Sequence, residues 1–265
     1  MNHKIMEDTI SIIKQKLQSL QHERGVKILF ACESGSRAWG FPSPDSDYDV
    51  RFIYAHHLEW YLSLNEHNDV IELPINRDLD INGWDVRKAL CLLAKHNAVL
   101  FEWMQSPIVY SSNEAFEKEW NALAPSFFNP IAAMHHYLSM SKKYLEECTQ
   151  GQQVKLKKYL YCLRTTLAAS WIAKNSSIPP MELVNLMELV KDEKLLVENI
   201  REIIRLKATK EESYHHPKEK ALEEFLFATI GHCEKVAPSL TGAKGDMSAL
   251  NDLFIRSIRP HKHEH

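Results

Sequence analysis

A glycine–serine turn between two apolar segments, the second of which begins with a pair of aspartates, restricts this chain more than any other feature. Residues 26–31 form an apolar run typical of a buried strand, and Gly35-Ser36 follows shortly after it. Ten residues then separate Ser36 from Asp47, and Asp47-Tyr48-Asp49 leads into a second apolar strand. This order predicts two strands of a small sheet, with acidic side chains at the start of the second strand.

The alternation of side chains along a strand places Asp47, Asp49 and Arg51 on one face, while Tyr48 and Val50 point to the other face and can enter the core. Two acids at a strand end are electrostatically unfavourable unless a cation sits between them. Hard cations such as Mg²⁺ are bound by carboxylate oxygens together with substrate phosphates. Asp47 and Asp49 are therefore candidate ligands of Mg²⁺ or Mn²⁺ beside a phosphate group.

The region before residue 126 is predicted to be mixed α/β. An amphipathic pattern predicts a helix from about Lys4 to Arg24, in which Ile13, Leu17 and Leu20 fall at helical spacing. The other expected elements, in chain order, are a short helix or irregular segment at 58–64, strands at 69–73 and 79–81, a helix opening at Gly83-Trp84-Asp85 with Asp85 as its cap, a helix at 98–105 and a short strand at 108–110.

From Asn129-Pro130 onward the pattern predicts helices only, and Pro130 is a favourable first helical residue. They are expected near 130–148, 154–174, 180–190, 193–208, 217–237 and 248–258. The predicted class is therefore α+β, with a small mixed sheet flanked by helices in residues 1–125 and an all-α domain in residues 126–258. Residues 259–265 are expected to be a disordered tail.

The composition is that of an ordinary globular protein and narrows the range of partners. The net charge of −3 gives no overall basic excess that would indicate nucleic-acid binding, although a local basic cleft would be compatible with RNA as a partner. Five scattered cysteines without a CxxC pair indicate free thiols in a reducing compartment. The N-terminus lacks an apolar signal core, and no run is long enough to span a bilayer. We therefore expect a cytoplasmic protein that does not enter the membrane.

The turn and the acid pair resemble the signature of the DNA polymerase β-like nucleotidyltransferase superfamily. The longer stretches 34–41 and 43–51 are more specific and resemble a bacterial and phage group of predicted nucleotidyltransferases associated with RNA ligases. Further blocks at 80–90, 102–110 and 157–164 fit the same group. The resemblance thus covers most of the chain and is strongest over 33–110, and it points to a role in RNA processing or repair.

The resemblance implies an enzyme that binds a nucleoside triphosphate at the turn. Gly35 would let the backbone approach the polyphosphate, and Ser36 would offer a hydroxyl and an N–H to its oxygens. The segment from Arg37 could open a short helix whose N-terminus faces the anion. Arg37 and Arg51 are candidate charge-assisted donors to the triphosphate. In that reading Asp47 and Asp49 hold the metal.

The superfamily also places a third acid on a later strand, where it activates the attacking hydroxyl. We predict that this acid is Asp80, which lies on an expected strand where alternation lets it face inward. It would act as general base or as a ligand of one metal ion. Asp78 and Asp85 remain open as alternatives, although Asp78 is more typical of a turn and Asp85 of a helix cap.

The helix expected at 154–174 has two interpretations. Lys157, Tyr161 and Arg164 are spaced so that they share one face of it. That face is either a solvated stripe or, as in the helical domains of the superfamily, a wall of the nucleotide pocket. In the second case Lys158 and Tyr161 are candidate nucleotide-binding residues.

The sequence therefore favours a Mg²⁺-dependent nucleotidyltransferase. It would move a nucleoside monophosphate from a nucleoside triphosphate to an unidentified hydroxyl acceptor (an RNA end, a protein or a small molecule) and release pyrophosphate. The alternative is an antitoxin-like member of the superfamily that binds a nucleotide or a partner with little turnover.

Overall fold

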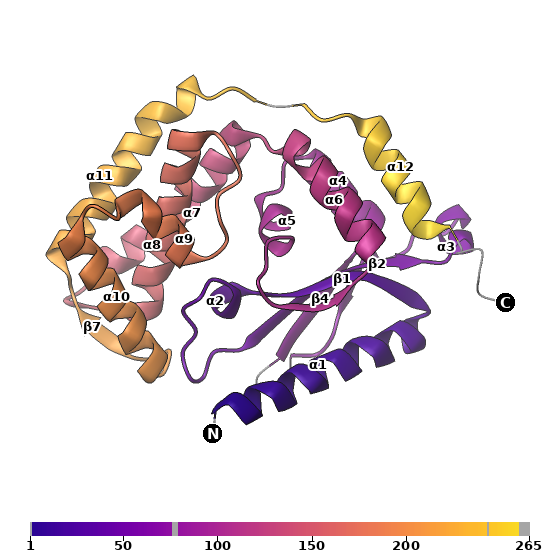
Figure 1. Cartoon of the computed structure of the whole chain (residues 1–265), viewed down its shortest axis with the longest axis horizontal. Coiled ribbons are helices and arrows are strands. Elements are labelled where there is room, and N and C mark those ends of the chain that lie inside the picture. Colours follow the sequence, from indigo (N-terminus) through magenta and orange to yellow (C-terminus); the bar gives the residue numbers. More distant parts are fainter. Residues whose placement is uncertain (1, 76–78, 243, 260–265) are drawn as a thin grey trace.

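The computed structural model describes residues 2–75, 79–242 and 244–259, with side chains from residue 8 onward. It confirms the α+β class: a five-stranded mixed sheet is packed beside a group of helices within the described residues (Figure 1). Among the described residues, no helix is both long enough and apolar enough to cross a membrane. The expected tail from 260 onward and the alternative third acid Asp78 lie outside the described residues.

The sheet has the strand order β3-β4-β2-β1-β5. Its strands are β1 (Val26–Ser34), β2 (Tyr48–His56), β3 (Val70–Glu72), β4 (Leu79–Asp85) and β5 (Val109–Ser112). β2 runs parallel to β4, whereas the other neighbouring strands pair antiparallel. The parallel pairing aligns the start of β2 with the start of β4, and this brings the acids of the two strands together.

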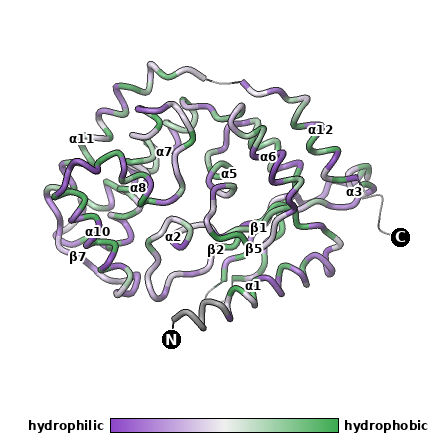
Figure 2. Tube along the Cα trace, viewed as in Figure 1, coloured by the Kyte–Doolittle hydropathy of each residue, from purple (hydrophilic) through white to green (hydrophobic). Residues whose placement is uncertain are grey.

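One face of the sheet is covered by α1 (Asn2–Arg24), which runs along it in Figure 1. Ile13, Leu17 and Leu20 of this helix are buried in a core with the Val50 and Phe52 side chains of β2. Hydrophobic and hydrophilic residues alternate along α1, as Figure 2 shows. Because Val50 and Phe52 point to α1, the alternate residues Asp49 and Arg51 face the opposite side of the sheet.

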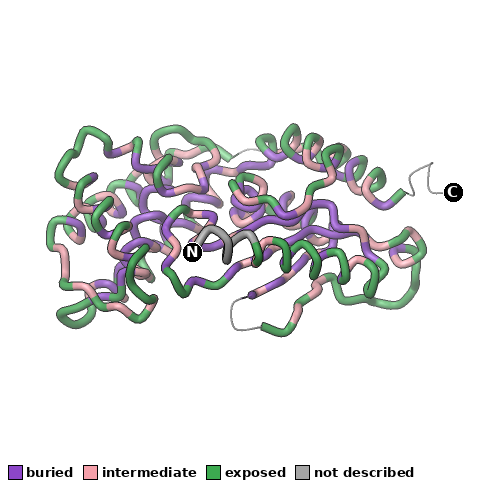
Figure 3. The backbone as a smooth tube through the Cα atoms, turned by 60° about the horizontal axis from the view of Figure 1, so that its bottom comes forward, coloured by how far each residue is buried: buried purple, intermediate pink, exposed green. Residues whose placement is uncertain are grey.

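The opposite face is covered by helices from both halves of the chain. They are α2 (Gly35–Ala38), α3 (Leu58–Leu62), α4 (Val86–Ala94), α5 (Ala98–Trp103), α6 (Glu114–Phe127) and α12 (Met247–Ile258). α12 returns from the C-terminal half to pack against α4 and α6, and the strands of the sheet are buried between these layers (Figures 1 and 3).

The helical half consists of α7 (Pro130–Thr149), α8 (Leu156–Asn175), α9 (Leu183–Leu186), a 3₁₀ turn (Met187–Val190), α10 (Lys194–Thr209), α11 (Lys220–Val236) and a second 3₁₀ turn (Ala237–Ser239). It also contains a short antiparallel pair, β6 (Gln153–Lys155) and β7 (His215–Pro217), which the prediction of helices only omits. The largest buried apolar cluster runs from Leu29 in β1 to Ile258 in α12, so the sheet and the helices share one core.

Two local expectations differ from the structure. The expected start of the helix at Gly83 is wrong, because β4 continues to Asp85 and the helix α4 begins at Val86. A Cβ at Gly83 would lie 2.2 Å from the Phe52 ring. Asp85 does cap the helix that follows, since its side chain accepts the Arg87 N–H at 2.8 Å. α6 is absent from the predicted elements, and the expected domain boundary at 125 falls within it.

Candidate functional site

The Gly-Ser turn lies directly against the second aspartate. Gly35 has a φ of +66°, a left-handed conformation that favours glycine. A Cβ placed on Gly35 would lie 2.1 Å from Asp49 Oδ2, so any side chain there would collide with the carboxylate. Glycine is therefore needed at position 35 because Asp49 leaves no room for a side chain, whether or not a polyphosphate also approaches the backbone there.

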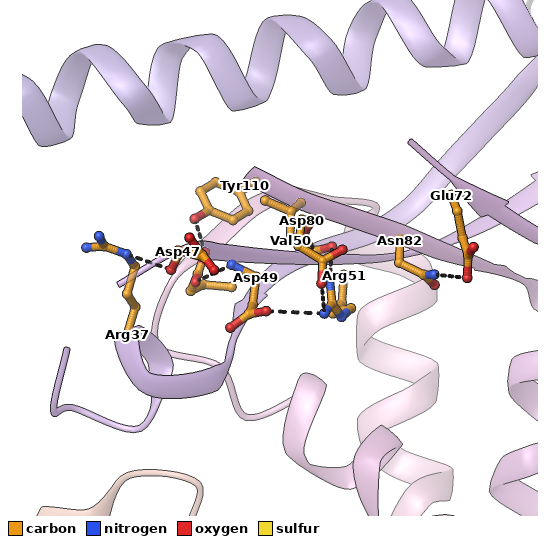
Figure 4. Close-up of polar contacts among 10 residues, drawn as sticks. Arg37, Asp47, Asp49, Val50, Arg51, Glu72, Asp80, Asn82 and Tyr110 are labelled. Atoms are coloured by element: carbon orange, nitrogen blue, oxygen red, sulfur yellow. Dashed lines mark hydrogen bonds and ion pairs between the residues drawn. The ribbon is translucent and has the colours of Figure 1, made fainter. Parts of the chain in front are cut away.

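Asp49 and Asp80 are brought together by the parallel pairing of β2 and β4, in which they are directly opposite one another. The Arg51 guanidinium lies between them, with one nitrogen 3.2 Å from Asp49 Oδ1 and 2.7 Å from Asp80 Oδ2 (Figure 4). Arg51 also donates to the Asp80 backbone carbonyl at 3.0 Å. The predicted pairing of Asp49 with a third acid is thus present, and Arg51 supplies the positive charge between the two.

The electrostatics of this pair suit a divalent cation. Burial raises the pKa of Asp49, and the neighbouring charges of Asp80 and Asp47 raise it further, while Arg51 and Lys157 oppose them. About one third of each of the two carboxylate side chains, Asp49 and Asp80, is exposed (32% and 35%), so both are accessible from solvent. Two accessible carboxylates that repel each other are suitable oxygen ligands for Mg²⁺ or Mn²⁺.

Asp47 and Arg37 lie at the edge of this pair. Asp47 is exposed, and its backbone carbonyl accepts the Arg37 Nε–H at 3.1 Å. The Arg37 guanidinium also donates to the Ser46 carbonyl at 2.6 Å and stacks 3.8 Å over the Tyr48 ring. The described residues contain no group of three or more His, Cys, Asp or Glu side chains that could hold a metal. The structure therefore brings Asp49 and Asp80 together without assembling all three predicted acids into one ligand set.

Tyr161 of α8 lies within electrostatic reach of Asp49. Asp49 and Glu212 are among the charges that, together with burial, raise the pKa of the Tyr161 hydroxyl. Lys157 forms an ion pair with Glu212 at 2.7 Å and lies over the Tyr161 ring, and Lys158 pairs with Glu147 at 2.5 Å. Both lysines are therefore paired with acids of the helical half of the chain.

The interpretation of that face as a solvated stripe is wrong for Arg164, which is buried. Its guanidinium pairs with Glu102 of α5 at 3.0 Å and lies 4.4 Å from the Trp39 ring centre. Arg164 therefore joins α8 to the sheet half of the molecule.

Two of the three candidates for the third acid can be compared directly. Asp80 lies beside Asp49 on the neighbouring parallel strand, and about one third of its side chain is exposed. Asp85 is buried, accepts the Tyr61 hydroxyl at 2.6 Å and caps α4, so it is occupied by structural contacts. Of these two candidates, Asp80 is the one that lies beside Asp49.

Glu33 is a functional candidate that the sequence analysis missed. It is fully buried near the end of β1, where its carboxylate accepts the Asp49 N–H at 2.9 Å and the Tyr110 hydroxyl. Burial raises the pKa of Glu33 to about 7, and the Asp49 charge adds to this. The sequence did carry a signal for this residue: Glu33 is an acid that follows a mostly apolar run, directly before the turn.

Glu33→Gln is expected to make the stability of the folded protein depend less on pH. The pKa of Glu33 is about 7 in the folded chain and 4.5 as its ordinary value, so the folded state binds the proton more tightly. Stability is therefore lost as pH rises from 4.5 to 7, by about 3 kcal/mol if the shift is fully expressed. Glutamine keeps both contacts, because its oxygen can accept the Asp49 N–H and its amide can donate to Tyr110.

Urea denaturation between pH 4.5 and 8 in EDTA measures this effect. The stability of Glu33→Gln relative to wild type should increase over that range, whereas the exposed control Glu198→Gln should not change it. If the free energy of unfolding changes with pH in the same way for wild type and Glu33→Gln, the raised pKa of Glu33 is contradicted.

The class of this protein is nucleotidyltransferase-like, of the DNA polymerase β type, and the match to a family model shows it. The sequence model of the RNA repair pathway DNA polymerase beta family matches residues 9–256, and the chain belongs to this family.

A curated relative from Bacillus subtilis (strain 168), "Uncharacterized protein YcgL", is 42% identical over 248 residues, which cover 93% of this chain and 95% of the relative. Among solved structures, a nucleotidyltransferase-like protein from Exiguobacterium sibiricum 255-15 is 12% identical with a TM-score of 0.31. That alignment covers 95% of this chain and 81% of the solved one, and a likeness of this size carries no argument about function.

Proposed function

We propose that this protein is a nucleotidyltransferase that depends on Mg²⁺ or Mn²⁺. It would transfer a nucleoside monophosphate from a nucleoside triphosphate to a hydroxyl acceptor. The observation that carries the proposal is the placement of Asp49 and Asp80 opposite one another on parallel strands, with the Gly35 turn against Asp49. This arrangement offers carboxylate ligands beside a backbone turn that a polyphosphate can approach.

In the proposed reaction the acceptor oxygen attacks the α-phosphorus, and the bond from that phosphorus to the bridging oxygen breaks. Pyrophosphate leaves, and the acceptor proton passes to the Asp80 carboxylate. Asp49 and Asp80 would hold the divalent cation, which supplies charge neutralisation at the reacting phosphate when bound, and Asp47 at the edge of this pair is the further candidate ligand. Arg51 contacts both Asp49 and Asp80, so it is suitably placed to compensate their charge in the metal-free protein.

The nucleotide would lie between the turn and α8. Gly35, Ser36 and Arg37 would form the triphosphate seat, with Arg51 as a further donor. Lys158 and Tyr161 would form the opposite wall, which the proximity of Tyr161 to the Asp49 charge supports.

An RNA end is the first acceptor to test, because the matched family is named for an RNA repair pathway. The chain itself has a net charge of −3, so the case for RNA rests on the family and not on overall charge.

The decisive experiment incubates the protein with each α-labelled nucleoside triphosphate, Mg²⁺ or Mn²⁺, and separate pools of RNA, protein and small hydroxyl compounds. We expect label transfer with release of pyrophosphate, loss of both on addition of EDTA, and recovery when excess Mg²⁺ is restored. Label retained in the RNA pool after protease treatment identifies RNA as the acceptor.

Two outcomes would contradict the proposal. Pyrophosphate release that is indifferent to EDTA would exclude metal-dependent transfer by this site. A metal-dependent complex with the triphosphate, without label transfer to any pool, would favour the antitoxin-like binding protein instead.

A further inference from the structure

A buried lysine from the helical half is connected by hydroxyl groups to the serine of the Gly-Ser turn. Lys207, in the last turn of α10, is 2% exposed, and its ammonium donates to Ser43 Oγ at 3.0 Å. Ser43 Oγ lies 2.8 Å from Ser46 Oγ, and Ser36 Oγ lies 3.2 Å from Ser46 Oγ. All three serines are buried, each 4% exposed.

The directions of these hydrogen bonds follow from the number of lone pairs on each oxygen. Ser46 Oγ accepts the Ser43 N–H at 2.9 Å and the Ser36 hydroxyl, so its own proton is left to point to Ser43 Oγ. The donations therefore run away from the turn, from Ser36 to Ser46 to Ser43, and the Ser43 hydroxyl donates to the Asp45 carboxylate.

A phosphate oxygen at Ser36 would require the opposite direction, because the anion can only accept. Ser36 would then donate to the phosphate and accept from Ser46, and Ser46 would accept from Ser43. Ser43 would still accept from Lys207, whose ammonium can only donate. Each serine oxygen keeps a donor and an acceptor, and the Ser43 hydroxyl turns from the Asp45 carboxylate to Ser46. Only hydroxyl protons rotate, since the heavy atoms already lie at hydrogen-bonding distances, and Asp45 still accepts the Glu212 N–H.

The reversed chain leads from a buried cation to the bound anion. Hydrogen bonds that run in one direction polarise one another, and they do so more strongly where solvent is excluded. The carboxylates of Glu212 and Asp45 favour the charged form of Lys207, although burial and the Lys157 charge lower its pKa.

We propose that Lys207 is a positioning residue of the triphosphate seat, which acts on a bound phosphate through Ser43, Ser46 and Ser36 without touching it. This inference rests on the proposed function, because it assumes that a triphosphate binds at the turn. It adds a residue from α10, more than 150 positions away from the turn in sequence, to the machinery that recognises the substrate.

The test compares equilibrium binding of nucleoside triphosphate, inorganic tripolyphosphate and nucleoside monophosphate, each with Mg²⁺, to the full-length protein. Lys207→Met keeps the length of the side chain and removes its charge, and Ser46→Ala interrupts the relay while leaving every charge in place. We expect each to weaken triphosphate and tripolyphosphate binding about tenfold, the size of one charge-assisted hydrogen bond, and to leave monophosphate binding unchanged.

The double variant Lys207→Met/Ser46→Ala should bind no more weakly than either single variant, because both break one chain. Lys210→Met, three residues further on and exposed, is the matched control and should bind as wild type. If thermal denaturation shows that Lys207→Met does not fold, the comparison of triphosphate binding between Ser46→Ala and wild type tests the inference.

Unchanged triphosphate binding in Ser46→Ala, equal losses for triphosphate and monophosphate, or losses that multiply in the double variant would each overturn the inference. Wild-type protein that binds none of the triphosphates would overturn the proposed function and the inference with it. The failure of the proposed function can be told from the failure of the inference alone, because the first appears in the wild type and the second only as a comparison between variants.

Discussion

Asp49→Asn is expected to lower the rate of nucleotidyl transfer about a thousandfold, which corresponds to ~4 kcal/mol of lost transition-state stabilisation. The substitution preserves the size of the side chain and its place against Gly35, where Asp49 Oδ2 is 2.1 Å from the position of a Cβ. It removes the negative charge that would bind the divalent cation. It also leaves Arg51 with Asp80 as its remaining acidic contact.

Single-turnover assays of labelled transfer, at saturating triphosphate and Mg²⁺, measure this loss. Asp252→Asn is a suitable control, because Asp252 is an exposed acid on α12 and its substitution removes the same charge. Thermal denaturation should show Asp49→Asn to be folded, since the pKa of Asp49 is already raised by burial and by Asp80 and Asp47. A rate within tenfold of wild type in a folded Asp49→Asn protein would remove Asp49 from the proposed chemistry.

The parts of the site that the sequence could predict are those set by strand alternation. The spacing of Asp49 and Arg51 puts both on one face of β2, whereas Asp47 precedes the first residue of the strand and is not placed by its alternation. The choice of Asp80 followed from the same rule on a second strand, and the parallel register that aligns it with Asp49 agrees with that choice.

The contacts that the sequence could not predict depend on tertiary packing. Arg51 could be placed on the acidic face, but its bridge between Asp49 and Asp80 exists only because β4 pairs with β2. Gly83 suggested a helix start, whereas packing against the Phe52 ring makes it a strand residue. Lys207 gave no signal at all, because its partner Ser43 lies 164 residues away.

In the helical half, the sequence predicted most of the helices but not which of their faces contact the sheet half. The long apolar periodicities identified α7, α8, α10 and α11, since local spacing is enough to mark an amphipathic helix. The short pairing of β6 with β7 has no comparable local pattern. Which face of α8 is buried against the sheet half could not be decided by spacing, and the position of Arg164 resolves it.

Arg164→Met is expected to destabilise the protein by about 4 kcal/mol, the usual cost of removing one partner from a buried ion pair. Arg164 and Glu102 are 3% and 11% exposed as side chains, so the substitution leaves the Glu102 carboxylate buried without its cation, and the Tyr137 hydroxyl still donates to it at 2.7 Å. The Met181 carbonyl would also lose the Arg164 Nε–H, which donates to it at 2.9 Å.

Urea denaturation of Arg164→Met, Glu102→Gln and the double variant measures the coupling. Glu102→Gln removes the charge while its oxygen can still accept the Tyr137 hydroxyl, so Arg164→Met should cost much less in that background than in wild type. Arg205→Met is the matched control: its ion pair with Glu202 is mostly exposed, at 74% and 59%, and its loss should cost less than ~0.5 kcal/mol. A cost below ~1 kcal/mol for Arg164→Met, or the same cost in both backgrounds, would show that this ion pair does not hold α8 against the sheet half.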